Sequence, residues 1–412
     1  MTGAAPTAGA ITRSSVARVG VATVLSAVCG YAVLYLAARD LAPVGFSLFS
    51  VFWGAFGLFT GAAFGLLQEA TREVRSVRGG APTDGPHTHP MRVAAGVAVA
   101  AAVSIGLSSP LWAPHVFAAS EHLSVTLLAI GLAGFCLHAT LLGVLAGVDG
   151  WTQYGTLMVI DAAIRVAVAV TAFVLGWGLD GYLWATVAGS MSWLLVLSCS
   201  GVARQAAAIR TRGTTRTFLT GASHSITAAG ASAILVMGFP VLLKATTEDL
   251  GATGGVVILA VTLTRAPLLV PLTAMQGNLI AHFVDNRRLR ALLIPALVLA
   301  GLGGVAVLAA GLLGPWLLRV GFGPEYVASG GLLAWLTAGA VAIAFLTLTG
   351  AATVAAAQHR AYAAGWVAAT LAATALLLLP TELQTRTVVA LLCGPMVGIA
   401  VHLAALIRLR AR

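Results

Sequence analysis

Long apolar runs, separated by short polar or charged breaks, dominate the chain. Each run is about 20 residues or longer, the length an α-helix needs to cross the hydrocarbon core of a bilayer. The runs lack the ten-residue alternation of barrel strands, so the spanning element is predicted to be the helix. The pattern predicts about twelve transmembrane helices, over residues 17–38, 44–67, 93–113, 122–146, 153–175, 182–203, 221–244, 254–282, 291–318, 329–351, 361–380 and 387–407.

The composition fixes the broad class. Of the 412 residues, 59% are hydrophobic and only 9% are charged, and the mean hydropathy is +0.96. A soluble domain carries roughly 25% charged residues, so this chain has too few to cover a surface in water. We therefore predict an all-α polytopic membrane protein. Soluble enzymes and nucleic-acid-binding proteins are excluded, despite the net charge of +10.

The distribution of basic residues predicts the orientation. With the N-terminus placed in the cytoplasm, 17 of the 23 basic residues fall in cytoplasmic segments, two lie within spans and four fall on the outer side: Arg39, Lys244, Arg319 and Arg386. Lys and Arg concentrate on the cytoplasmic side of membrane proteins. The first apolar run is longer than a signal-peptide core, so we interpret it as an uncleaved helix. The prediction is a multi-pass protein of the plasma (cytoplasmic) membrane with both termini in the cytoplasm.

Two segments about half a chain apart resemble each other. "SPLWAPHVFAASEHLSVTLLAIGLAGF", from Ser109, and "GPWLLRVGFGPEYVASGGLLAWLTAGA", from Gly314, both have an early Pro and aromatic residue, a Phe, an acidic residue and then a Leu/Ala/Gly-rich helix. They join spans three to four and nine to ten, so a six-plus-six duplication places them equivalently. The predicted organisation is a disordered cytoplasmic N-terminus (1–16), two six-helix lobes (17–203 and 221–407) around a central cavity, a basic cytoplasmic linker (204–220) and a basic cytoplasmic tail (408–412).

Three motifs resemble those of a transporter family. "YLAARDLAPVGFSLFSVFWGAFGLF", at the end of the first span, resembles the AR-x-L-G-P-x-x-Y/F-G signature of Wzx-type polysaccharide flippases. "VGFGPEYVASGGLLAWL" resembles their F-G-x-x-Y-x-x-A-x-x-L segment, and "LLGVLAGVDGWTQYG" resembles their loop after span four. The likeness covers nearly the whole chain. Ala42 departs from the family pattern, which usually has glycine at this position.

The resemblance implies both a fold and a function. Wzx-type flippases belong with the multidrug/oligosaccharidyl-lipid/polysaccharide exporters, which share a twelve-helix, two-lobe fold. The implied function is flipping of a lipid-diphosphate-linked oligosaccharide by alternating access, for cell-surface polysaccharide synthesis. The implied partners are the lipid-linked glycan, the bilayer and, in the same pathway, glycosyltransferases and a polymerase. Neither a cofactor nor nucleic acid is implied.

Two ionisable residues share one face of span five. Asp161 and Arg165 lie four residues apart, a spacing at which side chains on a helix can pair directly. A purely structural ion pair is one interpretation. In the other, both residues face the cavity, where Arg165 binds an anionic headgroup and Asp161 orients it or takes up a coupling proton.

Arg265 in span eight has no acidic partner on its own helix. No Asp or Glu lies between Asp249 and Asp285, and Pro267 and Pro271 follow Arg265 closely. A charge at bilayer depth costs about 3 kcal/mol, and a helix break is tolerated there only within protein or beside water. The planar guanidinium binds two phosphate oxygens at once. The pattern therefore predicts a contact for a lipid diphosphate beside a helix break, with a brace between helices as the alternative.

Four further polar residues are weaker candidates. Arg39 begins the first outer loop, where it either contacts substrate or extends its side chain to the membrane interface. His138, Gln276 and Asn278 lie within spans. Hydrogen bonds between helices explain these three as readily as substrate contact does.

The sequence also separates the competing function classes. It has no GxxxxGK[ST] nucleotide loop, and its four cysteines lack metal-ligand spacing. His87 and His89 lie in a Pro/Gly-rich loop and are interpreted as solvated, so neither a catalytic nor a metal site is predicted. A polytopic glycosyltransferase needs acidic residues in a sizeable outer loop, and every predicted outer loop is short. An ion-coupled drug or small-molecule antiporter is the closer alternative, but two arginines against one aspartate within the spans favour an anionic substrate.

Overall fold

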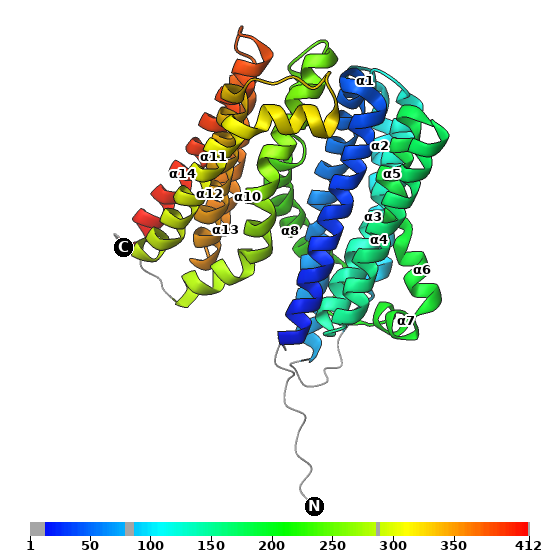
Figure 1. The fold of residues 1–412 in the computed structure, drawn as a ribbon. Helices are drawn as coiled ribbons and strands as arrows, with labels where there is room; N and C mark the ends of the chain where they lie inside the picture. Colours follow the sequence, from blue (N-terminus) through cyan, green and yellow to red (C-terminus); the bar gives the residue numbers. More distant parts are fainter. Residues whose placement is uncertain (1–12, 79–85, 286–288, 411–412) are drawn as a thin grey trace, which may run out of the picture.

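The computed structural model describes residues 13–78, 86–285 and 289–410, which form two groups of helices that lie side by side (Figure 1). We call these groups the N-lobe and the C-lobe. The N-lobe contains α1 (Arg13–Arg78), α2 (Pro90–Val116), α3 (Glu121–Gly147), α4 (Trp151–Leu175), α5 (Gly178–Ala188), η1 (Gly189–Met191), α6 (Ser192–Cys199) and α7 (Gly201–Ala207). The C-lobe contains α8 (Thr215–Val236), α9 (Phe239–Ala245), α10 (Gly251–Asp285), η2 (Leu289–Leu292), α11 (Leu293–Phe322), α12 (Gly330–Ala355), α13 (His359–Leu377) and α14 (Leu383–Arg410). A two-stranded antiparallel sheet pairs β1 (His87–Thr88) with β2 (Thr211–Arg212).

The helices account for the predicted membrane spans. Within the described residues, ten helical segments are long and apolar enough to cross a membrane. One of them is α1, which contains two helices merged across a kink, and α13, with 19 residues, supplies a further span. Counting both halves of α1 gives eleven apolar spans, and α13, counted by its length alone, brings the number to the predicted twelve. The all-α polytopic fold is confirmed.

The two halves of α1 meet at a single non-helical residue. Ala42 has φ 52° and ψ 175° and is followed by Pro43. Arg18 near the start of α1 and Arg75 near its end both lie beside Trp151, so the chain reverses direction at the kink. The predicted reversal between residues 38 and 44 is therefore made by a kink at Ala42 and not by a longer loop, because helix continues on both sides of this residue. Glycine, which Wzx-type flippases usually have here, is the residue that adopts this conformation without strain.

Replacing Ala42 with glycine should therefore stabilise the protein. The strain of such a conformation costs about 1–3 kcal/mol, whereas the extra chain entropy of glycine costs about 0.5–1 kcal/mol. The midpoint of thermal unfolding in detergent should rise for Ala42→Gly. Ala38→Gly, in the helix just before the kink, is the matched control and should lower the midpoint. A midpoint that falls for both variants would show that the kink stores no strain.

The two lobes repeat the same packing. In the N-lobe, α2 and the second half of α1 pack on α3, and α4 packs between the first half of α1 and α5. In the C-lobe, α11 and α10 pack on α12, and α13 packs between α8 and α14. A six-plus-six duplication makes these helices equivalent. The predicted lobe boundaries at residues 17, 203, 221 and 407 stay predictions.

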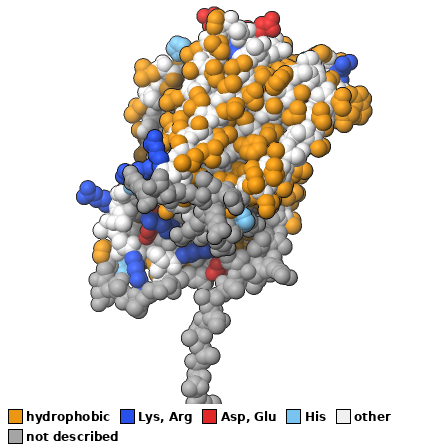
Figure 2. Space-filling model, turned by 90° about the vertical axis from the view of Figure 1, so that its left-hand side faces the viewer, with side chains coloured by type: hydrophobic (Ala, Val, Ile, Leu, Met, Phe, Trp, Pro, Cys, Tyr) orange, Lys and Arg blue, Asp and Glu red, His pale blue; other side chains and the backbone are white. Residues whose placement is uncertain are grey.

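A broad apolar surface covers the outer face of the C-lobe (Figure 2). Side chains of α11 contribute much of it, and those more than 60% exposed include Ile294, Leu297, Leu302, Val305, Leu308 and Leu312. A soluble monomer rarely exposes an apolar patch of this extent. A bilayer is the environment that covers such a surface, so the chain is a multi-pass membrane protein.

The segment predicted as a linker over 204–220 is largely structured. It contains the end of α7, all of β2 and the start of α8. The hydroxyl groups of Ser200 and Thr214 cap α7 and α8 by accepting bonds of 3.2 Å from the N–H groups of Ala203 and Thr217. The sheet holds β2 against β1, in the loop before α2. The linker is therefore attached to the N-lobe.

The start of α1 and the end of α14 lie at the same end of the molecule (Figure 1). That this end is cytoplasmic is a prediction, which single cysteines in a cysteine-free background can test. Cysteine at Ser76 or Thr214, both exposed there, should be protected from an impermeant thiol reagent in intact cells. Cysteine at the exposed Glu248, in the predicted outer loop before α10, should react and is the control. Labelling of either of the first two from outside would invert the topology.

Candidate functional site

Arg265 lies on an unbroken helix opposite a broken one. The α10 helix continues from Gly251 to Asp285 through Pro267 and Pro271, so the break expected beside Arg265 in span eight is absent. The break occurs in span seven instead, at Met237 and Gly238 between α8 and α9. The sequence signal for it is Pro240, which has no N–H to donate to the carbonyl of Val236.

Arg265 contacts the carbonyl groups that this break leaves free. Its Nη1 donates to the carbonyl oxygens of Leu235, at 3.4 Å, and of Val236, at 3.1 Å. The last carbonyls of a helix carry its negative partial charge and lack helical donors. Arg265 therefore braces α10 against the end of α8, as the alternative interpretation of this residue proposed.

Among the described residues, the other edge of the Arg265 guanidinium has no hydrogen-bond partner. The residue is only 7% exposed and lies over the ring of Phe239, at 5.1 Å from its centroid. Its Nε and Nη2 atoms are buried without an acceptor. A buried donor left unpaired costs about 1–3 kcal/mol. Nε and Nη2 form the edge of the guanidinium that can bind two oxygens of a phosphate or carboxylate at once. A bound anion would therefore accept hydrogen bonds from both nitrogens.

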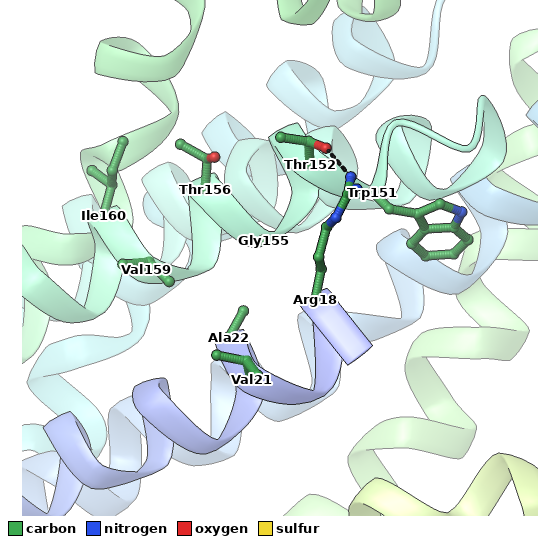
Figure 3. Close-up of a pocket in the computed structure, with 9 residues that line it drawn as sticks. All are labelled: Arg18, Val21, Ala22, Trp151, Thr152, Gly155, Thr156, Val159 and Ile160. Atoms are coloured by element: carbon green, nitrogen blue, oxygen red, sulfur yellow. Dashed lines mark hydrogen bonds between the residues drawn. The ribbon is translucent and has the colours of Figure 1, made fainter. Parts of the chain in front are cut away.

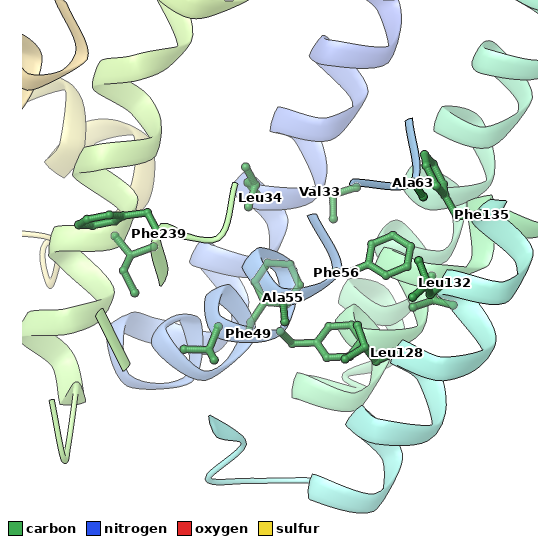
Figure 4. Packing of buried hydrophobic residues seen from close by; sticks show 14 of the residues in the cluster. Val33, Leu34, Phe49, Ala55, Phe56, Ala63, Leu128, Leu132, Phe135 and Phe239 are labelled. Carbon is green, nitrogen blue, oxygen red and sulfur yellow. The ribbon is translucent and has the colours of Figure 1, made fainter. Parts of the chain in front are cut away.

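The Arg265 site lies at the junction of the two lobes. Tyr31, in the first half of α1, is close enough to Arg265 to interact electrostatically. The second half of α1 packs on α8 and α9 through a row of glycines. An added Cβ would collide with Ala233 at Gly61 and with Ile226 at Gly65, and would press tightly on Pro240 at Gly54. Small residues at such spacing let membrane helices approach closely. Phe239 therefore lies beside α1, on the opposite side from Phe135 of α3 (Figure 4).

Asp161 and Arg165 form the predicted ion pair inside the N-lobe. The Nη2 of Arg165 lies 3.0 Å from the Oδ1 of Asp161, and Nε lies 3.2 Å from both carboxylate oxygens. Nη1 donates to the carbonyl of Thr186 at 2.8 Å, and the guanidinium lies 5.5 Å from the ring centroid of Phe56. Gly189 packs directly against the pair. All three guanidinium nitrogens are thus engaged, unlike those of Arg265, and a role in transport stays a prediction.

Of the remaining candidates, His138 lies close enough to Asp161 and Arg165 to interact with them electrostatically. His138 is buried, with Nδ1 3.0 Å from the hydroxyl oxygen of Ser192 and its ring stacked on Phe135, a hydrogen bond of the kind expected between helices. Arg39 is exposed beside the kink of α1, near Gly323 and apart from both sites. Gln276 and Asn278 lie on α10, but their side chains fall outside the described residues. In the described part of the chain, no group of three or more His, Cys, Asp or Glu is placed to hold a metal ion.

One contact between the lobes was not predicted. The hydroxyl of Tyr326, in the loop between α11 and α12, donates to the carbonyl of Ala38 at 2.8 Å, and its ring meets Phe46 edge to face. Burial, reinforced by the neighbouring Glu325, raises the pKa of Tyr326, so the hydroxyl stays protonated as a donor. Tyr326 belongs to the VGFGPEY motif and Ala38 to the AARDLAP motif, so two of the three motifs that carry the resemblance to flippases contact each other.

A buried carboxylate was also missed. Glu69, 2% exposed, lies between α1 and α8, pairs with Arg72 and packs against Gly221. Burial raises the pKa of the adjacent Glu73, and Arg72 opposes that shift. In the sequence these residues look like an ordinary charged loop, because nothing in the local pattern indicates that α8 covers them.

Comparison with known proteins identifies close relatives. No family model matches the chain. The uncharacterized protein Mb3654 of Mycobacterium bovis is 68% identical over 403 residues, which cover 97% of this chain and 94% of its own. The uncharacterized protein Rv1510 of Mycobacterium tuberculosis is 68% identical over 407 residues, covering 98% and 94%. The chain belongs to this mycobacterial protein family.

The fold of the mycobacterial family is that of known transporters. A multidrug resistance MATE family transporter of the MOP superfamily, in an inward-facing conformation, superposes with a TM-score of 0.71 at 14% identity, over 94% of this chain and 96% of that one. A multidrug resistance MATE family transporter of the same superfamily, in an outward-facing conformation, superposes with a TM-score of 0.65 at 18% identity, over 96% of this chain and 95% of that one. At these identities the likeness establishes the fold, so the two-lobe exporter fold implied by the motifs is confirmed. The narrower resemblance to Wzx-type flippases stays a prediction.

Proposed function

We propose that this protein flips a lipid-diphosphate-linked oligosaccharide across the plasma membrane by alternating access, for cell-surface polysaccharide synthesis. The observation that carries the proposal is the free edge of Arg265. Nε and Nη2 are buried at the lobe junction without an acceptor, and a diphosphate offers the paired oxygens that this edge binds. The contact between two of the three flippase-like motifs, through Tyr326 and Ala38, adds support.

The same geometry suggests how substrate binding and lobe movement are linked. Arg265 belongs to α10 of the C-lobe, holds the break between α8 and α9 and lies close to Tyr31 of the N-lobe. An anion bound at Nε and Nη2 would therefore touch the boundary across which the lobes move. A ligand shifts a conformational equilibrium only if it binds the two states differently, and a site on a moving boundary meets that condition.

An ion-coupled antiporter of drugs or small molecules is the second candidate. It is favoured by the structural neighbours, which are multidrug resistance MATE family transporters. Asp161 would then be the coupling group. Its carboxylate is already bonded to Arg165 through three nitrogen–oxygen contacts, which leaves a cation little to bind. This arrangement favours the anionic substrate.

Depletion of the protein in its own organism separates the two functions. Loss of the flippase should cause an undecorated lipid-linked precursor to accumulate on the inner leaflet. Drug susceptibility should stay unchanged in cells that receive the surface polysaccharide by a second route, so that the missing polysaccharide does not itself alter it. Loss of an antiporter should raise drug accumulation and leave the precursor pool as it was. Complementation with the wild-type gene is the control. A normal precursor pool in depleted cells would contradict the proposal.

A further inference from the structure

A cavity separate from both arginine sites opens between the first half of α1 and α4 (Figure 3). Its volume is about 500 Å³, within the range of about 300–1,000 Å³ in which proteins bind small molecules. Its walls come from one lobe alone, and neither Arg265 nor the Asp161–Arg165 pair lines it. The residues that line it are Arg18, Val21, Ala22, Trp151, Thr152, Gly155, Thr156, Val159 and Ile160.

The cavity is polar at one end and apolar at the other. Figure 3 shows Arg18, Trp151 and Thr152 together at one end, and Val159 and Ile160 at the opposite end. Nη1 of Arg18 donates to the hydroxyl oxygen of Thr152 at 2.9 Å, and the Arg18 side chain is exposed. Such a cavity complements a molecule with an anionic head and a hydrocarbon tail.

Its position in the membrane matches this polarity. Trp151 and Tyr154 form an aromatic pair, with ring centroids 5.9 Å apart, and Arg75 lies over the Trp151 ring. Tryptophan, tyrosine and arginine gather at the level of lipid headgroups. From Val21, an exposed apolar stripe continues along the same face of α1 to Leu25 and Val28, towards the middle of the membrane. The polar end therefore lies at headgroup depth and the apolar end among acyl chains.

We propose that this cavity binds one anionic phospholipid from the leaflet at the N-terminal end of α1. Arg18 binds the phosphate by a charge-assisted hydrogen bond, and one acyl chain lies in the groove between Val21 and Val159. Gly155 keeps the groove open, because even a Cβ there would lie 3.6 Å from the Cβ of Ala22. The proposal does not rest on the transport function, since the lipid is a resident ligand of the N-lobe.

Native mass spectrometry of the purified full-length protein tests the site, with phosphatidylglycerol and phosphatidylcholine as probes. Wild type should retain one phosphatidylglycerol and prefer it over phosphatidylcholine by at least about tenfold, which is the effect of one charge-assisted hydrogen bond. Arg18→Gln should lose the preference but keep weak binding of both lipids. Gly155→Leu, or Thr156→Phe at an exposed position, should lose binding of both by filling the groove.

Two control variants change the same properties elsewhere. Arg216→Gln removes an exposed charge at the same end of the molecule, and Gly20→Leu adds the same bulk on α1 where the surroundings of Gly20 are open. Both should bind phosphatidylglycerol as wild type does. Unchanged preference in Arg18→Gln, or unchanged binding in both groove variants, would overturn the proposal. Displacement of phosphatidylglycerol by an equal concentration of polyprenyl diphosphate would also overturn it, because the cavity would then serve the transported lipid.

Discussion

Export of the lipid-linked glycan should fall about tenfold or more when Arg265 is replaced by glutamine. The substitution removes the charge and the Nε/Nη2 edge, and a hydrogen bond to a charged group contributes about 1.5–3 kcal/mol, or roughly ten- to hundredfold. The glutamine amide ends near the position of Nε and falls short of the carbonyls of Leu235 and Val236, so the brace between α10 and α8 is weakened as well. The readout is accumulation of the undecorated lipid-linked precursor on the inner leaflet, at matched protein levels.

Arg265→Lys distinguishes charge from geometry. Lysine keeps the positive charge but lacks the planar fork, so export should be partial and lie between those of wild type and Arg265→Gln. Arg319→Gln, at an exposed arginine of the C-lobe, is the matched control and should export normally. Normal export by well-expressed Arg265→Gln would mean that Arg265 serves only as a brace.

Breaking the Asp161–Arg165 pair should destabilise the protein more than removing it altogether. The two side chains are 17% and 14% exposed, and removing one partner of a buried pair costs about 3–5 kcal/mol because the other charge stays uncompensated. Arg165→Ala should therefore lower the thermal midpoint in detergent further than the double variant Asp161→Ala, Arg165→Ala. Arg92→Ala, at an exposed arginine of the N-lobe, should leave the midpoint near wild type.

Transport by the double variant decides the role of the pair. If Asp161 and Arg165 take part in coupling or in binding the headgroup, the double variant should regain expression and stability but not export. Full export by the double variant would reduce the pair to a structural element. Equal thermal midpoints for the single and double variants would show instead that the charges are not buried together.

The spans, the fold class and the pairing of Asp161 with Arg165 followed from the sequence because each depends on local spacing. Twenty apolar residues make a span wherever they lie, and two residues four apart on a helix meet whatever surrounds them. The isolation of Arg265 was also local, since no acid lies within helical reach. These features therefore required no knowledge of how the helices are arranged.

The partners of Arg265 and Tyr326 required that knowledge. Pro267 and Pro271 drew attention to a break in α10, yet tertiary packing keeps that helix intact and the break lies 30 residues earlier. Pro240, which causes it, is a single letter within an apolar run. Likewise the Tyr326–Ala38 bond joins positions 288 residues apart, and no periodicity along the chain indicates such a contact.

The short sheet between β1 and β2 fixes the length of the tether that joins the lobes. We call this sheet, together with Gly213, the clamp: the N–H of Gly213 donates to the carbonyl of Pro86, and its carbonyl accepts from the hydroxyl of Thr88. The α8 helix begins at Thr215. Thr214 is therefore the one residue between the clamp and the C-lobe, and one residue spans at most about 3.6 Å. A tether this short permits rotation but hardly any translation, so a movement of the C-lobe relative to the sheet would turn about Gly213, with φ 95°, and Thr214.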